Sequence, residues 1–130
     1  MKITINKESL VKNVQDQFNI RYPFLKLEFF KNYSNGKAIP KIERAGANEL
    51  VKQLPGFVNE GIINIDYKRT VTELENDFKK QIGIMVEVFR RSGNVWIETS
   101  LTDDWTLEQQ NKEGEQISSH FSERDTKHNW

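Results

Sequence analysis

The chain has 130 residues, with 19 lysines and arginines against 19 aspartates and glutamates, and it contains no cysteine. This length is typical of one domain. The balanced charge provides no overall field that attracts nucleic acid or an anionic membrane. The lack of cysteine excludes a disulfide framework, a thiolate zinc site and a cysteine nucleophile.

No apolar stretch approaches the length of about 18 residues that a membrane span requires. The opening Met1-Lys2-Ile3-Thr4 does not resemble the start of a signal peptide. We therefore expect a cytoplasmic protein without a membrane partner, a compartment with which the absence of cysteine is compatible.

Two copies of one hydrophobic pattern, about sixty positions apart, organise the sequence. Ile3-Thr4-Ile5 recurs as Ile63-Asn64-Ile65. The apolar positions Val11, Val14 and Phe18 recur as Val71, Leu74 and Phe78, and Leu25-Lys26-Leu27 matches Val86-Glu87-Val88 after one residue of slippage. In each copy the apolar period changes from 2 to about 3.6 and back, which is typical of a strand, an amphipathic helix and a second strand.

These copies, residues 2–31 and 61–91, predict a duplicated βαβ unit. Two such units in tandem favour an α+β fold of the split βαβ, ferredoxin-like type, with a mainly antiparallel sheet and the helices on one face. The alternative is that any two βαβ units share this much pattern by chance.

Local signals mark the ends of both helices. In the second copy, Thr70 and Glu73 predict a capping box before the apolar stripe. In the first copy, Asn6 is the expected cap. Pro23 and Gly83 occupy equivalent places, where each helix has to end before the next strand begins.

Residues 31–60, between the copies, carry several turn-forming residues and are predicted to be a loop, with one short helix near residues 48–54. Loops of this length are uncommon in a compact domain and are usually functional or mobile. A tolerated insertion is the simpler interpretation.

After the second copy, Ser92-Gly93 predicts a turn into an added strand over residues 94–99. A helix over about residues 104–117 should follow, and it should be marginal because it has few apolar positions and contains Gly114, which costs ~1 kcal/mol of helix stability relative to Ala. We expect residues 1–117 to form a single domain and residues 118–130 to be a disordered tail.

The segment from Phe89 to Thr99, together with Thr102-Asp103-Asp104-Trp105-Thr106-Leu107, resembles a small family of uncharacterised bacterial proteins. The resemblance extends to the first copy at fewer positions. It implies no activity, cofactor or site residue for this chain.

The hairpin predicted around Ser92-Gly93 gives the sheet two faces. Phe89 is expected opposite Trp96, Glu87 opposite Glu98, and Arg91 opposite Asn94, all on an outer face that points away from the helices. Lys26 and Glu28 should stand on the same face. A register slip of one residue would exchange the two faces. The candidate binding residues on the outer face are Phe30, Glu87, Phe89, Arg91, Trp96 and Glu98.

Three interpretations of this face stay open. Aromatic side chains with a charged rim are typical of a protein interface, including that of a homodimer in which Arg91 of one subunit offsets Glu87 or Glu98 of the other. The same aromatics suit base stacking by single-stranded nucleic acid, although the glutamates oppose a phosphate backbone. Alternatively, the C-terminal helix covers the aromatics through Trp105.

No pattern predicts a catalytic site. Glu87 and Glu98 form a possible carboxylate pair, Asp103-Asp104 is more simply a helix start, and His120 and His128 lie in the expected tail. No phosphate loop, dinucleotide fingerprint or metal-ligand cluster is present. We therefore expect a protein-interaction module without enzymatic activity, cofactor or metal, whose partner is another protein or a second copy; nucleic acid is the alternative.

Overall fold

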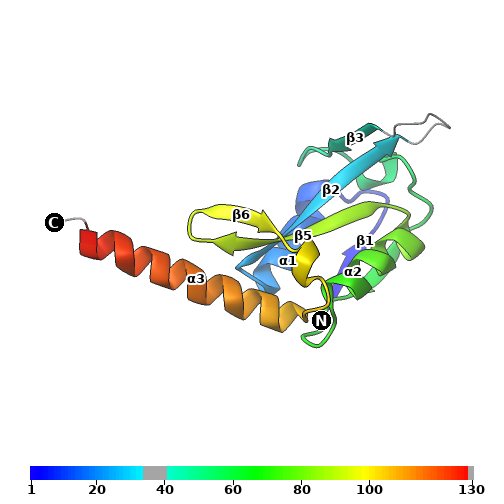
Figure 1. The fold of residues 1–130 in the computed structure, drawn as a ribbon. Helices are drawn as coiled ribbons and strands as arrows, with labels where there is room; N and C mark the ends of the chain where they lie inside the picture. Colours follow the sequence, from blue (N-terminus) through cyan, green and yellow to red (C-terminus); the bar gives the residue numbers. More distant parts are fainter. Residues whose placement is uncertain (34–40, 129–130) are drawn as a thin grey trace.

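The computed structural model describes the backbone of residues 1–33 and 41–128 and the side chains of residues 1–31 and 42–119. The fold is α+β, as predicted (Figure 1). The strands and helices are β1 (Lys2–Ile5), α1 (Val11–Arg21), β2 (Leu25–Tyr33), β3 (Lys41–Arg44), β4 (Gly61–Asn64), α2 (Val71–Asp77), β5 (Met85–Ser92), β6 (Val95–Glu98) and α3 (Leu107–His128). Shorter turns follow at Val51–Gln53 and Ser100–Thr102, both 3-10, and at Phe78–Ile82, where a π-helical turn continues α2.

Within the described residues, the strands form two antiparallel sheets, one of four strands in the order β3-β2-β5-β6 and one of two strands, β1 and β4. This corrects the predicted ferredoxin-like arrangement, in which both strands of each copy enter one sheet. Here the first strands of the two copies pair with each other, and so do the second strands. The reason is that each second strand continues into a hairpin, β2–β3 or β5–β6, and its remaining edge is filled by the second strand of the other copy.

The strand register agrees with the repeat in the sequence. Ile3 pairs directly with Ile63, and Leu27 pairs directly with Val88. In both cases the two partners are the residues that the sequence repeat makes equivalent. A pseudo-two-fold axis through these two pairs therefore relates one copy to the other.

The repeat extends further than the predicted βαβ units. The N–H of Lys12 donates to the carbonyl of Ala47 at 2.9 Å, and in the second copy Thr72 donates to Asp103 at the same distance. Residues 41–44, which we predicted to lie in a loop, form β3, so the loop prediction is wrong for this part. The 3-10 turn Val51–Gln53 lies within the short helix predicted near residues 48–54. Residues 41–53 are the first copy's counterpart of β6 and the start of α3; residues 34–40 lie outside the described residues.

The inner face of the four-stranded sheet lies in the hydrophobic core. The ring of Phe29 on β2 meets that of Phe78 edge to face, with centroids 5.9 Å apart. Both predicted helix stripes are buried, which confirms the periodicity. The core includes Ile3, Ile5, Val11, Val14, Phe18, Leu25, Leu27, Phe29, Ile63, Ile65, Val71, Leu74, Phe78, Val86 and Val88.

The predicted capping box is confirmed, because Glu73 N–H donates to the Thr70 hydroxyl at 3.1 Å and Thr70 N–H donates to the Glu73 carboxylate at 2.9 Å. Gly83 ends the second helix with a φ of 92°, also as predicted. Asn6 is not the cap of α1. Its side chain accepts from Glu8 N–H in the preceding turn, and the helix begins after Leu10.

The C-terminal helix differs most from the prediction. It runs to His128, through most of the segment that we expected to be disordered, and extends beyond the rest of the molecule in Figure 1. Polar contacts dock its first half: Arg90 donates to the buried Gln110 at 2.7 Å, and Phe24 N–H donates to Asn111 at 2.9 Å. Because these docking contacts are polar, the pattern of apolar residues does not indicate them, and the sequence therefore predicts only a marginal helix.

Candidate functional site on the outer face of the sheet

The register of the β5–β6 hairpin differs from the predicted one by two residues. Arg91 pairs with Trp96 and Phe89 pairs with Glu98. The turn consists of Gly93 and Asn94, with Gly93 at a φ of 68°, so it lies one residue later than we predicted. Because a shift of two residues preserves the alternation of side chains, the predicted faces are unchanged.

All six predicted residues therefore share the outer face, and Lys26 and Glu28 join them as expected. Arg44 on β3, which pairs with Phe30, also lies on this face and was not predicted there. The only available signal was the short segment Lys41-Ile42-Glu43-Arg44 inside the predicted loop, and its alternation was too brief to indicate a strand.

Cations lie over the aromatic rings of this face. The guanidinium of Arg44 is 5.4 Å from the ring centroid of Phe89 and 5.8 Å from that of Phe30. Lys26 and Arg91 approach Trp96 at 5.8 Å and 5.9 Å. Such contacts are attractive because the ring face carries negative charge density. Phe89 is only 7% exposed as a result, whereas the rings of Phe30 and Trp96 stay half-buried.

The C-terminal helix does not cover this face, so the interpretation based on Trp105 is wrong. Trp105 lies against Arg90, with the guanidinium carbon 5.4 Å from the ring centroid. Arg90 alternates with Phe89 and Arg91 along β5 and points to the inner side, where it also contacts Gln110 of α3. The aromatic rings on the outer face are instead covered by cationic side chains that belong to the sheet itself.

Three carboxylates accompany the cations. Glu28 is 4% exposed and forms ion pairs with Lys26 at 2.7 Å and with Arg44 at 3.5 Å. Glu87 stands directly opposite Glu28 on β5. Neither Glu87 nor Glu98 forms an ion pair with any residue whose side chain the structure describes, and the same holds for Arg91.

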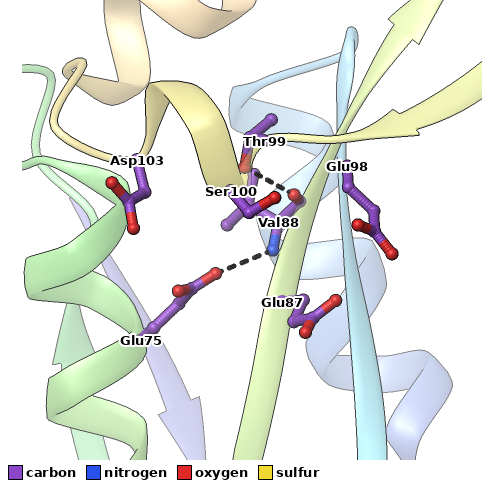
Figure 2. A pocket seen from close by; sticks show the side chains of 7 residues that line it. All are labelled: Glu75, Glu87, Val88, Glu98, Thr99, Ser100 and Asp103. Carbon is purple, nitrogen blue, oxygen red and sulfur yellow. Dashed lines mark hydrogen bonds between the residues drawn. The ribbon is translucent and has the colours of Figure 1, made fainter.

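A small pocket of about 60 Å³ adjoins the outer face where β6 ends (Figure 2). Figure 2 shows Glu75 and Asp103 on one side of β5 and Glu87 and Glu98 on the other. The remaining lining comes from Val88, Thr99 and Ser100. The volume is far below the ~300–1,000 Å³ of pockets that hold small organic ligands.

The backbone of Val88 explains part of this pocket. Its N–H donates to the Glu75 carboxylate at 3.2 Å, and its carbonyl accepts from the Thr99 hydroxyl at 2.7 Å (Figure 2). The ladder with β6 stops at Phe89, so these side chains take over the hydrogen bonds that a longer strand would make. The contacts are structural ones.

The pocket also perturbs two carboxyl groups. Burial raises the pKa of Glu75 to about 7, and the charges of Glu87 and Asp103 act in the same direction, against the hydrogen bond from Val88. Burial and the neighbouring charge of Glu98 raise the pKa of Glu87. Glu75 can therefore exchange a proton near neutral pH. Among the side chains at 1–31 and 42–119, no group of three or more histidines, aspartates or glutamates is arranged to hold a metal ion.

No protein-family model, curated protein or solved structure matches this chain. The resemblance of the second hairpin to a bacterial family therefore stays a prediction. Within the part of the chain that the structure describes, no helix has the length and apolar character needed to cross a membrane.

Proposed function

We propose that this protein is a non-enzymatic interaction module that binds another protein chain through the outer face of the β3-β2-β5-β6 sheet, and that it acts in the cytoplasm. The observation that carries the proposal is the grouping of Phe30, Phe89 and Trp96 beneath cations on one sheet face, which no helix covers in the described part of the chain. Tryptophan, phenylalanine and arginine are the side chains in which protein interfaces are enriched.

Charged side chains without an ion pair support the same proposal. Arg91, Glu87 and Glu98 have no ion pair within the described side chains, whereas Glu28 forms ion pairs with both Lys26 and Arg44. Opposite charges on a partner steer association and select the partner. A face with both signs of charge favours a partner surface that also carries both.

Single-stranded nucleic acid is the competing outcome. Arg44 adds a cation that the sequence analysis had not placed on this face, so the face carries Lys26, Arg44 and Arg91 against three glutamates. A phosphate backbone requires a net positive surface, and this balance does not supply one. We therefore favour protein as the partner.

The test compares Trp96→Lys with Val95→Lys, a matched control because Val95 is 53% exposed and lies next to Trp96 with its side chain on the opposite face. Self-association is followed by size-exclusion chromatography with light scattering, and binding of other chains by affinity capture. We expect Trp96→Lys to lose binding and Val95→Lys to retain it, with similar melting temperatures. Equal binding by the two variants would contradict the proposal.

Fluorescence anisotropy with mixed-sequence RNA and single-stranded DNA tests the competing outcome. We expect weak binding even at low salt, because the three glutamates repel phosphates. Micromolar affinity that falls steeply with salt and is lost in Arg91→Ala would make the face a nucleic-acid site instead.

A further inference from the structure

We infer that the free edge of β6 receives an extended segment of another protein as a fifth strand of the sheet, and that this segment carries a basic side chain followed by uncharged ones. The inference rests on the proposed function, because β6 also contributes Trp96 to the outer face. Exposed sheet edges bind extended peptides through main-chain hydrogen bonds, and the neighbouring side chains provide the specificity.

The backbone direction of β6 follows from a contact of its neighbour β5. The N–H of Arg91 donates to the carbonyl of Phe24 at 3.0 Å, on the side of β2. In an antiparallel ladder, the N–H and C=O groups of directly opposed residues either face each other or both face away. Trp96, the strand partner of Arg91, therefore directs its N–H and C=O away from β5. Because this direction alternates along a strand, Glu98 directs its backbone groups outward as well.

These outward groups are available to another chain. Among the residues that the structure describes, none forms a hydrogen bond with the backbone N–H or carbonyl that Trp96 and Glu98 direct outward. Backbone N–H and C=O groups are strong hydrogen-bonding groups. An added strand thus finds one donor and one acceptor at each of these two residues.

The composition of β6 does not protect its edge. Charged side chains, especially lysine, are among the usual devices that prevent an edge strand from pairing with another chain. At the opposite edge of the sheet, β3 contains Lys41, Glu43 and Arg44 among its four residues. β6 instead has three apolar residues before Glu98, and the first of them, Val95, is 53% exposed. β6 is therefore the edge of this sheet that better accepts a further strand.

The carboxylates beside this edge favour a basic side chain on the added strand. Glu98 stands on the outer face of β6, and Glu87 lies near it at the pocket (Figure 2). Neither forms an ion pair with a side chain that the structure describes. The residue opposite Glu98 on an added strand would have its Cβ about 4.5–5.5 Å away. A lysine or arginine at that position offsets the charge of both carboxylates.

The remaining positions favour uncharged side chains. Two cations already lie against the ring of Trp96, so a third beside it would be repelled. Val95 and Ile97, on the other side of the strand, favour apolar neighbours. For a strand antiparallel to β6, the sequence Lys-Val-Thr-Val places its lysine opposite Glu98 and its threonine opposite Trp96. β6 contains no cation, so a second copy of β6 does not fit this charge.

A synthetic peptide, acetyl-Ser-Lys-Val-Thr-Val-Ser-amide, tests the inference in an NMR titration of the isotope-labelled protein. We expect the peptide to shift the amide signals of Trp96 and Glu98 and to slow their hydrogen exchange. In antiparallel pairing, the N–H groups of the peptide's lysine and threonine face β6, and those of its valines face away. N-methylation of the threonine should weaken binding about tenfold or more, because a hydrogen bond is lost, whereas N-methylation of the preceding valine should leave binding nearly unchanged.

A peptide with glutamate in place of lysine tests the charge. It should bind about threefold to tenfold more weakly, since like charges would then stand opposite each other. Equal losses from the two N-methylated peptides, or unchanged amide signals in β6, would overturn the inference. Exchange of the same amides that slows with rising protein concentration, without peptide, would make a second copy the occupant and would overturn it too.

Glu98→Pro separates this inference from the proposed function. It removes the outward N–H, and proline is tolerated on an edge strand where the N–H faces solvent. Glu98→Gln is the matched control, because it also removes the charge but keeps the N–H, and melting temperatures verify that both variants fold. Peptide binding that Glu98→Gln retains and Glu98→Pro loses supports the inference.

Capture of another protein distinguishes the two failures. If Glu98→Pro still captures a protein that Trp96→Lys loses, strand addition is overturned and the interaction module stands. If Trp96→Lys and Val95→Lys capture that protein equally, the proposed function itself fails.

Discussion

The carboxylate of Glu75 accepts a hydrogen bond from the backbone N–H of Val88 at 3.2 Å. Gln15 occupies the equivalent position in α1, and its amide donates to the carbonyl of Leu27 at 2.8 Å. Leu27 is the strand partner of Val88 at the pseudo-two-fold axis. Each copy therefore sends one helical side chain to the backbone of its own second strand, but only the second copy uses an ionisable group.

This difference predicts a pH-dependent stability. Burial raises the pKa of Glu75 to about 7, whereas an unfolded glutamate titrates near 4.3. The folded state binds more protons between these values, so the free energy of unfolding contributed by Glu75 falls as the pH rises through this window. Glu75→Gln should therefore be more stable than the parent at pH 8, on the order of 1 kcal/mol after allowing for solvent screening, and should lose this advantage near pH 4.5.

Urea denaturation at the two pH values measures this effect. Glu73→Gln is the control of opposite sign, because hydrogen bonds from Thr70 lower the pKa of Glu73 and make its charged form the favoured one. It should reduce stability at pH 8. A Glu75→Gln advantage of equal size at both pH values would show that the gain has another cause.

The two copies should contribute similarly to the core. Phe18 and Phe78 are equivalent residues, and both are fully buried. Replacing either by Ala removes a large side chain from a packed interior and should cost about 3–5 kcal/mol of unfolding free energy. Ile20→Ala is the control on α1, since Ile20 is 75% exposed and should change stability by less than about 0.5 kcal/mol. Thermal or urea unfolding distinguishes these values, and small losses in both Phe variants would refute the paired core positions.

Replacing Gly114 by Ala should destabilise the protein, although Ala has the higher helix propensity. In an exposed helix, Ala would gain about 1 kcal/mol over Gly. A Cβ at this position would lie 2.9 Å from the Cβ of Phe24 and 3.1 Å from the Cγ of Arg90. We expect Gly114→Ala to destabilise the protein by roughly 1–3 kcal/mol, as overpacking does. Gln116→Ala, on the exposed side of α3, should be close to neutral, and a raised melting temperature in Gly114→Ala would exclude this close approach.

The contributions of Arg90 and Gln110 to stability should be strongly coupled. Both side chains are buried, and the Nε of Arg90 has no hydrogen-bond partner within the described structure. Gln110→Ala would remove the acceptor of a buried guanidinium and should cost about 2–3 kcal/mol or more. In an Arg90→Met background, the same Gln110→Ala change should reduce the free energy of unfolding by a much smaller amount. Equal costs in the two backgrounds, measured as a double-mutant cycle, would contradict the coupling.

Local signals predicted the elements of this fold well. The capping box of Thr70 and Glu73, the helix end at Gly83 and the buried stripe from Val71 to Phe78 depend on residues within a few positions of one another. Helix formation and capping are set at that range, so one sequence contains the information. The prediction of which side chains share a face of the sheet was also correct, in spite of a register error of two residues, because side chains alternate with a period of two.

The sequence by itself thus determined the buried stripes of α1 and α2 and the inner and outer faces of β2, β5 and β6. Only the tertiary structure decided that Leu27 pairs with Val88, that Arg44 lies over Phe89, and that α3 docks through Gln110 on the inner side. These contacts join residues far apart in the chain and depend on which strand edges remain free after the hairpins form. Hydrophobic periodicity reports whether a side chain is buried, but it carries no information about which distant segment buries it.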